Sequence, residues 1–328
     1  KKTPEIMKQA KTLLMLPDYF GFRLTGNKLS EYTNGSTTQL VDPHTYQWDK
    51  ELIRKLGYPE DIFLPLQMPG TKVGQLLPEI QKEVGFDLEV VLCGSHDTAS
   101  AVMAVPQTEG DGIYISSGTW SLMGIESLKP VITEDAAAAN FTNEGGYDHR
   151  FRFLKNIMGL WMIQSVRHEY QDAYSFAQLC DMAEESRDFS SRVDVNDQSF
   201  LSPDSMIEAI KQYCQKTGQP VPETVGELAA VVYRSLAQSY GETVKELETI
   251  AGRIYDSIHI IGGGSNAAYL NQLTADATGK TVYAGPGEAT AIGNLLAQMI
   301  HAGDLADLKG ARQCVRDSFE IKTYVPAD

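Results

Sequence analysis

The last third of the sequence alternates strand-like and helix-like segments, and this alternation restricts the possible folds more than any other feature. SIHIIGGGSNAAYLNQLTADATG, residues 257–279, reads as an apolar strand, a triple-glycine turn and a helix. KTVYAGPGEATAIGNLLAQMIHAG, residues 280–303, repeats the same order. The pattern predicts an α/β fold with a parallel or mixed sheet covered by helices.

Length and composition predict a globular protein of two domains. The chain has 328 residues, which exceeds the size at which a single hydrophobic core usually keeps growing. Hydrophobic residues make up 42% and charged residues 22%, as in ordinary folded proteins. We therefore expect an extensive buried core rather than a disordered chain.

The charge of the chain argues against nucleic acid as a partner. The formal net charge is -15 and the pI is about 4.9, whereas proteins that follow a phosphate backbone need clustered Lys and Arg. The sequence also lacks a membrane-length apolar run and a signal-peptide pattern, and its four cysteines form no C-x-x-C pair. These features favour a cytoplasmic enzyme with no membrane partner, and they leave the oligomeric state open.

A first group of chemically active residues follows the apolar run LEVVLCG at 88–94. This run predicts a buried parallel strand, and the ASAVMAV segment that follows Thr98 is compatible with a helix. His96, Asp97 and Thr98 would then lie at the carboxyl end of a strand, where ligands bind in open α/β sheets. Taken alone, however, an Asp-Thr pair is better explained by helix capping.

A second group lies in GDGIYISSGTWSLMGIE, where two apolar runs flank the small residues 116–119. The pattern predicts a β-hairpin whose turn, which includes Thr119, would let a phosphate approach closely. By itself it is more often an ordinary turn. The later stretch NFTNEGG, residues 140–146, reads as a loop.

Residues 151–170, FRFLKNIMGLWMIQSVRHEY, show an apolar stripe that predicts a single helix. The polar residues Asn156 and Gln164 interrupt this stripe. On a helix they would lie about 12 Å apart along its axis. The alternative is that both side chains face solvent. Further helices are predicted over 202–218 and 227–250, and the segment 4–26 reads as a short helix broken by Pro17.

The glycine turn at 262–264 does not match the common nucleotide motifs. It lacks the third glycine of G-x-G-x-x-G, and the chain has no G-x-x-x-x-G-K-[ST] loop. A dinucleotide enzyme and a P-loop fold are both disfavoured. A hydrolase is disfavoured as well, because no G-x-S-x-G elbow surrounds Ser116 or Ser117.

An ordered set of segments resembles the rhamnulokinase branch of the FGGY carbohydrate kinases, over Pro4 to Pro326. The set is CGSHDTASAV, YISSGTWSLMG, NFTNEGG, RFLKNIMGLWMIQ, HIIGGGSN, QLTADATG and GPGEATAIGN. The resemblance implies an actin-like, ribonuclease H-like fold with two domains around a cleft. Residues 1–104 would be what remains of the sugar-binding domain, and residues 105–328 the nucleotide-binding domain.

The resemblance also implies a role for each candidate residue. Asp97 would be the general base, and His96, Thr98 and Asn156 would bind the sugar with it. The nucleotide would be bound by the following residues: Thr119, Gln164, Gly262, Gly263 and Gly264. The cofactors would be ATP and Mg²⁺, with no metal ligand from the chain itself, and the reaction would convert L-rhamnulose to L-rhamnulose 1-phosphate.

Two alternatives to this reaction remain at the level of the sequence. One is another FGGY kinase acting on fuculose, xylulose or a similar ketose or polyol, and the other is a non-catalytic sugar or nucleotide sensor on the same fold. Nothing before Pro4 matches the glycine-rich phosphate loop with which the family opens. We therefore expect the 328 residues by themselves not to turn over.

Overall fold

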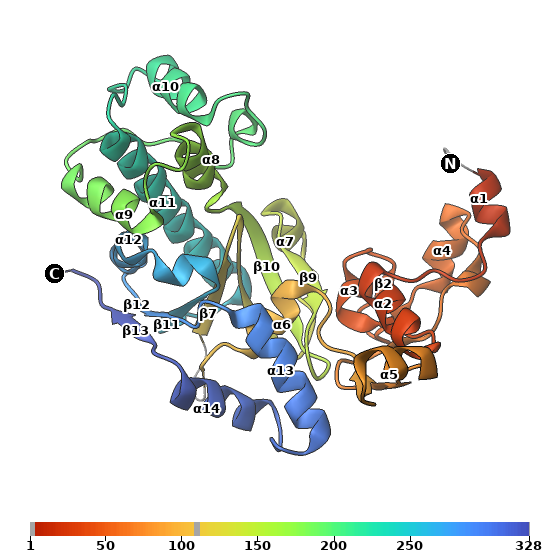
Figure 1. Cartoon of the computed structure of the whole chain (residues 1–328). Coiled ribbons are helices and arrows are strands. Elements are labelled where there is room, and N and C mark those ends of the chain that lie inside the picture. The colour runs from red at the N-terminus through yellow and green to blue at the C-terminus, as the bar shows by residue number, and fades with distance from the viewer. Residues whose placement is uncertain (1–3, 108–111, 328) are drawn as a thin grey trace.

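A seven-stranded mixed sheet forms the centre of the larger part of the molecule (Figure 1). The structure is a computed structural model and describes residues 4–107 and 112–327. The strand order is β13-β12-β11-β7-β8-β10-β9. The bounds are β7 (Gly112–Ser117), β8 (Trp120–Ser127), β9 (Thr142–Gly145), β10 (Phe151–Met158), β11 (Ser257–Ile261), β12 (Thr281–Ala284) and β13 (Lys322–Tyr324).

The sheet joins two segments that lie far apart in the sequence. Strands β7, β8, β10 and β9 pair antiparallel in that order, so that β10 lies between β8 and β9, whereas β11 pairs in parallel with both β7 and β12. The hairpin predicted over residues 110–126 is confirmed as β7 and β8, although Gly110 and Asp111 lie outside the described residues. The two βα units and the mixed sheet are confirmed as well. Because parallel strands place their carboxyl ends at one edge, the turns after β7 and β11 meet there.

Helices cover both faces of the sheet, and alternate side chains of the strands serve the two cores. Ile113 and Ile115 of β7 belong to the core beneath α8–α12, while Tyr114 belongs to the core beneath α6, α13 and α14. On the first side lie α8 (Trp161–Glu169), α9 (Phe176–Glu185), α10 (Met206–Lys216), α11 (Val225–Ala251) and α12 (Ala268–Thr278). On the second side lie α6 (Asp97–Met103), α13 (Ala289–Ala302) and α14 (Leu308–Ser318).

The N-terminal part forms a separate lobe of short elements, drawn in red to orange in Figure 1. Its small core contains Tyr32, Trp48, Ile53 and Leu66. Its helices are α1 (Pro4–Gln9), α2 (Leu16–Thr25), α3 (Tyr32–Ser36), α4 (Lys50–Leu56) and α5 (Pro78–Val84). Its strands are β1 (Ser30–Glu31), β2 (Val41–Asp42), β3 (Gln47–Trp48), β4 (Leu66–Gln67), β5 (Lys72–Gln75) and β6 (Glu89–Val91).

Helices α6 and α13 hold this lobe against the sheet. A β-carbon on Gly293 of α13 would lie only 1.8 Å from the carbonyl oxygen of Ser100 in α6, so the two helices approach more closely than any larger residue would allow. Further along α13, His301 Nε2 lies 2.6 Å from Glu89 Oε1 of β6. Helix α13 therefore contacts the chain on both sides of Asp97, at Glu89 before it and at Ser100 after it.

The structure contradicts the single helix predicted over 151–170. Residues Phe151–Met158 form strand β10, and only Trp161–Glu169 are helical. The strand lies between β8 and β9 in the sheet and is buried except at Lys155 and Asn156. It therefore lacks the apolar–polar alternation of a half-buried strand, and its apolar residues also fit one face of a helix. Gly159 marks the break, because a β-carbon there would lie 2.5 Å from the Trp120 carbonyl carbon.

Three other predictions are wrong in part. The run 88–94 contains only the half-buried β6, which pairs antiparallel with β5 rather than forming a buried parallel strand. NFTNEGG is not a loop throughout, since it contains β9. Pro17 lies in the first turn of α2 and so begins a helix instead of breaking one.

The other predicted helices are confirmed with shifted ends. The helix predicted from Ser202 or Pro203 begins at Met206, with Ser205 as its N-cap, and the one predicted over 227–250 spans 225–251. Within the described part of the chain, no helix is long and apolar enough to cross a membrane.

Because His259 is buried, we expect the unfolding free energy of the protein to fall at acidic pH. It lies in β11, stacks on Tyr283, and burial together with Arg312 and Arg316 lowers its pKa to about 4. The unfolded chain, with an ordinary histidine pKa near 6.5, binds more protons below that pH, so stability falls as the pH drops toward 4. Between pH 7 and pH 5 we expect His259 to account for about 2 kcal/mol of lost unfolding free energy.

Urea unfolding of the chain and of a His259→Gln variant at both pH values measures this difference. Other titrating groups occur in both proteins and cancel in the comparison. An equal loss of stability in the two proteins would contradict the assignment to His259.

Candidate functional site

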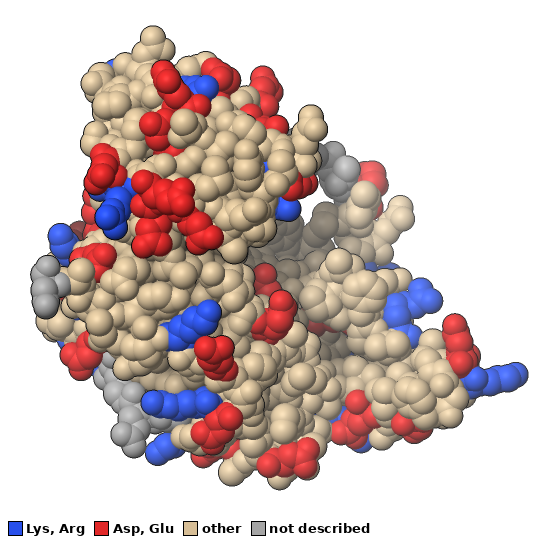
Figure 2. All heavy atoms as spheres, turned by 60° about the vertical axis from the view of Figure 1, so that its left-hand side comes forward, with Lys and Arg blue, Asp and Glu red and all other residues tan. Residues whose placement is uncertain are grey.

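A cleft of about 530 Å³ brings most of the predicted site residues together. It lies between the start of α6, the β7–β8 turn, and strands β9 and β10. Its lining residues are His96, Asp97, Thr98, Ser116, Gly118, Thr119, Trp120, Leu122, Glu144 and Asn156. Acidic side chains predominate on the face drawn in Figure 2, so an anionic ligand of this cleft must be bound by local donors.

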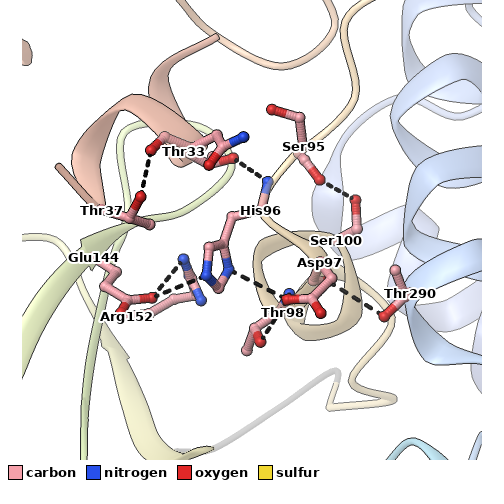
Figure 3. Close-up of polar contacts among 12 residues, drawn as sticks. Thr33, Thr37, Ser95, His96, Asp97, Thr98, Ser100, Glu144, Arg152 and Thr290 are labelled. Carbon is pink, nitrogen blue, oxygen red and sulfur yellow. Dashed lines mark hydrogen bonds and ion pairs between the residues drawn. The ribbon is translucent and has the colours of Figure 1, made fainter. Parts of the chain in front are cut away.

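Asp97 presents its carboxylate to the cleft. It is the first residue of α6, and its side chain is 79% exposed. Oδ1 accepts hydrogen bonds from the backbone N–H of Thr98 (2.6 Å) and the Thr98 hydroxyl (3.2 Å), and lies 3.5 Å from His96 Nδ1 (Figure 3). Since all three contacts involve Oδ1, Oδ2 is the oxygen left to interact with a ligand.

His96 connects Asp97 to a buried ion pair. Its Nε2 lies 3.9 Å from Glu144 Oε2, and the same oxygen lies 3.0 Å from Arg152 Nη2 (Figure 3). The Arg152 side chain is completely buried, and its Nε donates to the Gly145 carbonyl at 3.0 Å. Burial, and next the charge of Arg152, lower the pKa of His96, against the opposing effect of Glu144 and Asp97. His96 is therefore neutral at pH 7.

The turn between β7 and β8 pairs with the start of α8. Thr119 Oγ1 donates to Gln164 Oε1 at 3.4 Å, and the backbone N–H groups of Leu160 and Trp161 donate to the Gly118 and Thr119 carbonyls. Thr119 and Gln164 thus lie together, as their shared predicted role requires.

Asn156 reaches the cleft from a different element than predicted. It lies in β10, opposite Leu122 of β8, and not on one helix with Gln164. The spacing argument from a common helix is therefore wrong. Asn156 nevertheless lines the same cleft as His96 and Asp97, and its contact with a sugar remains a proposal.

The triple-glycine turn packs against the end of β7. Gly262 has φ of +82°, which favours glycine, and a β-carbon on Gly264 would lie 1.9 Å from Ser117 Oγ. A β-carbon on Gly263, by contrast, would meet no atom within 4 Å. The turn therefore borders the end of β7 at Ser117 and exposes backbone at Gly263, as a phosphate-bearing ligand needs.

The described residues offer donors for phosphates but no metal cage. Among residues 4–107 and 112–327, no group of three or more His, Cys, Asp or Glu side chains could hold a metal ion. Hydroxyl and backbone N–H groups at the β7–β8 turn and the glycine turn fit a nucleotide. A magnesium ion would be held mainly by the phosphates of that nucleotide.

Several residues of the cleft were not predicted as site residues. Glu144 lies in the NFTNEGG segment, which was noted as a motif, and its acidic residue was the available signal. Trp120 and Leu122, which line the cleft, and the buried Arg152, which pairs with Glu144, read as ordinary members of apolar runs. Only the pairing of β8, β9 and β10 brings them together.

Comparison with family models identifies both parts of the chain. Residues 113–302 match the C-terminal domain of the FGGY family of carbohydrate kinases, and residues 1–104 match the N-terminal domain of that family.

The chain is also similar to proteins named rhamnulokinase. The identity is 53% for the one from Halalkalibacterium halodurans, covering 100% of this chain and 70% of that protein. The identity is 50% for the one from Oceanobacillus iheyensis, covering 98% of this chain and 68% of that protein. It is 47% for the one from Bacillus subtilis, covering 99% of this chain and 67% of that protein. The chain therefore spans about two thirds of the length of these curated relatives.

Solved structures share the fold at low sequence identity. A ligand-bound xylulose kinase from Lactobacillus acidophilus superposes with a TM-score of 0.74 at 16% identity, covering 100% of this chain and 66% of that one. Plasmodium falciparum glycerol kinase with ADP gives a TM-score of 0.70 at 15% identity, covering 94% and 61%. These similarities confirm the predicted actin-like fold.

We expect substitution of Gly263 to impair nucleotide binding and substitution of Gly264 to impair stability. Gly263→Val should leave the melting temperature unchanged, because the side chain enters open space, but should raise the KM for ATP far more than the KM for the sugar. Gly264→Ala should lower the melting temperature, because the methyl group collides with Ser117. Thermal unfolding and the two KM values test both variants. Equal changes in both KM values for Gly263→Val would contradict a position at the nucleotide.

Proposed function

The chain belongs to the FGGY family of carbohydrate kinases, and we propose that its enzyme transfers the γ-phosphoryl group of ATP to L-rhamnulose, forming L-rhamnulose 1-phosphate. The observation that carries the proposal is the exposed Asp97 carboxylate in a cleft that also contains Thr119 and Asn156. The identity of 47–53% to proteins named rhamnulokinase favours this sugar over other substrates of the family. Because ATP is a substrate, the proposal includes a cytoplasmic location.

Asp97 is the proposed general base. Among the described residues, two carboxylates line the cleft, and they have different environments: Glu144 is 13% exposed and paired with Arg152, whereas Asp97 is 79% exposed. A base must reach the hydroxyl whose proton it removes. Of these two carboxylates, Asp97 meets this requirement, because the charge of Glu144 is already engaged by Arg152.

The neighbours of Asp97 orient the proposed base. Thr98 holds Oδ1 through its backbone N–H and its hydroxyl, which directs Oδ2 toward the sugar. Neutral His96 lies beside both carboxylates and can bond to a sugar hydroxyl without introducing a competing positive charge. Asn156, on the opposite wall, would bind a further hydroxyl.

The nucleotide side of the proposed site consists of uncharged donors. Thr119, Gln164 and the turn at 262–264 would hold the phosphates, and bound Mg-ATP supplies the phosphoryl group and the neutralising cation. We propose that residues 1–104 contribute mainly to the sugar side and residues 105–328 mainly to the nucleotide side. The loop containing Asp97 lies at their junction, where the hydroxyl and the γ-phosphate must meet.

Replacing the proposed base should lower turnover without preventing sugar binding. In the enzyme as encoded, with any sequence outside these 328 residues, Asp97→Asn should reduce kcat by about 10²-fold or more, the usual contribution of a positioned base. The KM for L-rhamnulose should change little. A steady-state assay of ADP release measures both, with Asp87→Asn, an exposed acid outside the cleft, as the matched control. Near-normal kcat in Asp97→Asn would refute the assignment.

A panel of sugars tests the substrate itself. We expect kcat/KM for L-rhamnulose to exceed that for L-fuculose and D-xylulose by at least about 10-fold, the discrimination that one altered polar contact can provide. The same ADP-release assay applies to all three. A preference for another ketose would show a different kinase of this family, and binding of sugar without any turnover would indicate a sensor.

A further inference from the structure

Glu31 is a completely buried carboxylate that lies outside the cleft lining. It ends strand β1 and is the N-cap of α3, and its side chain accepts five hydrogen bonds. Three come from its own segment: Thr33 N (2.7 Å), Thr33 Oγ1 (2.7 Å) and Asn34 N (3.0 Å). The other two come from Ser95, 64 residues later, through its backbone N–H (3.2 Å) and its hydroxyl (2.5 Å).

The second set of bonds reaches the loop that carries the proposed base. Ser95 lies two residues before Asp97, and the next backbone N–H, that of His96, donates to Thr33 Oγ1 at 3.2 Å (Figure 3). The Thr33 hydroxyl in turn donates to Glu31. Glu31 and Thr33 therefore bind two consecutive backbone N–H groups immediately before Asp97.

Capping of α3 does not by itself account for this residue. Ser, Thr, Asp and Asn are the common N-caps, and Glu is not among them. Burial disfavours the charged form and raises the pKa of Glu31, against the effect of its hydrogen bonds with Ser95 and Thr33. Burying an ionised carboxylate is costly unless every lone pair is used. Here two of the five bonds serve the Ser95 loop instead of the helix.

The position of Asp97 is restrained from two sides. Helix α6, which begins at Asp97, packs closely on α13 and restrains the residue from its C-terminal side. The contacts of the Asp97 side chain come from its neighbours His96 and Thr98, which move with the same backbone. The direction of the carboxylate therefore depends on α6 and equally on the path of the chain through Ser95 and His96.

We propose that Glu31 is a positioning residue that fixes the backbone at Ser95 and His96 and thereby places the Asp97 carboxylate for proton abstraction. The proposal rests on the function proposed for Asp97. Glu31 itself does not line the cleft and touches no substrate. A displacement of the base by about 1 Å is enough to lower the rate of a positioned reaction by about 10²-fold.

Two single variants test the proposal in the enzyme as encoded. Glu31→Gln keeps the size of the side chain but leaves only one oxygen to accept the five bonds from Thr33, Asn34 and Ser95. Ser95→Ala removes only the hydroxyl on the other side of the Glu31–Ser95 contact. We expect kcat to fall by about 10-fold or more in the first and about threefold in the second. The KM for ATP should stay within about twofold, because the nucleotide side is untouched.

A double-mutant comparison separates positioning from a general structural role. If Glu31 acts through Asp97, then adding Glu31→Gln to an Asp97→Asn enzyme should lower kcat by no more than about twofold. A merely structural Glu31 would lower kcat by the same factor in both backgrounds. Asp49→Asn, which changes the carboxylate N-cap of α4, is the matched control and should leave kcat unchanged.

The outcomes distinguish the two proposals from each other. Full kcat in Asp97→Asn would overturn the general base and with it the role of Glu31. Loss of kcat in Asp97→Asn, combined with normal kcat in folded Glu31→Gln and Ser95→Ala enzymes, would overturn only the positioning role. If Glu31→Gln does not fold, Ser95→Ala alone decides, since it changes a half-buried side chain by a single oxygen.

Discussion

The parallel pairing of β11 with β7 is the contact on which the arrangement of the cleft depends. Ser257–Ile261 align with Gly112–Ser116, although about 140 residues separate them in the chain. Because the strands run in the same direction, the turn after β11 packs against the end of β7, with Gly264 against Ser117. Without this register the glycine turn and Thr119 would not lie at the same edge of the sheet, the one at the carboxyl ends of β7 and β11.

A second constraint brings the proposed base to that edge. The Asp97 loop belongs to neither β7 nor β11 and is held from two directions. Helix α6, which follows it, packs on α13 at the close contact between Ser100 and Gly293. The loop itself is bonded to Glu31 and Thr33 of the N-terminal lobe. The position of Asp97 therefore depends on both parts of the molecule.

Much of the fold could be predicted because local pattern and tertiary structure agree. The βα units at 257–303 and the hairpin at 112–127 have the alternation and small-residue turns that their structure requires. Residues 151–158 could not be predicted in this way, because FRFLKNIM lacks the regular apolar–polar alternation of a half-buried strand and its apolar residues also fit one face of a helix. Gly159 was the one local sign of a boundary. The isolated pairs β1–β4 and β2–β3 are too short to leave any periodic signal.

The residues of the candidate site also differ in whether the sequence alone could reveal them, for the same physical reason. Asp97, Thr119 and the glycines at 262–264 could be selected from the sequence because each lies in a short segment of an ordered set that resembles the FGGY carbohydrate kinases. Glu31 could not, since an acidic residue in the polar run after Ser30 is indistinguishable from a solvated one until the fold buries it. Its significance lies in bonds to Ser95, 64 residues away. Residues that touch a ligand leave local patterns, whereas residues that place them are defined by contacts that only the folded chain creates.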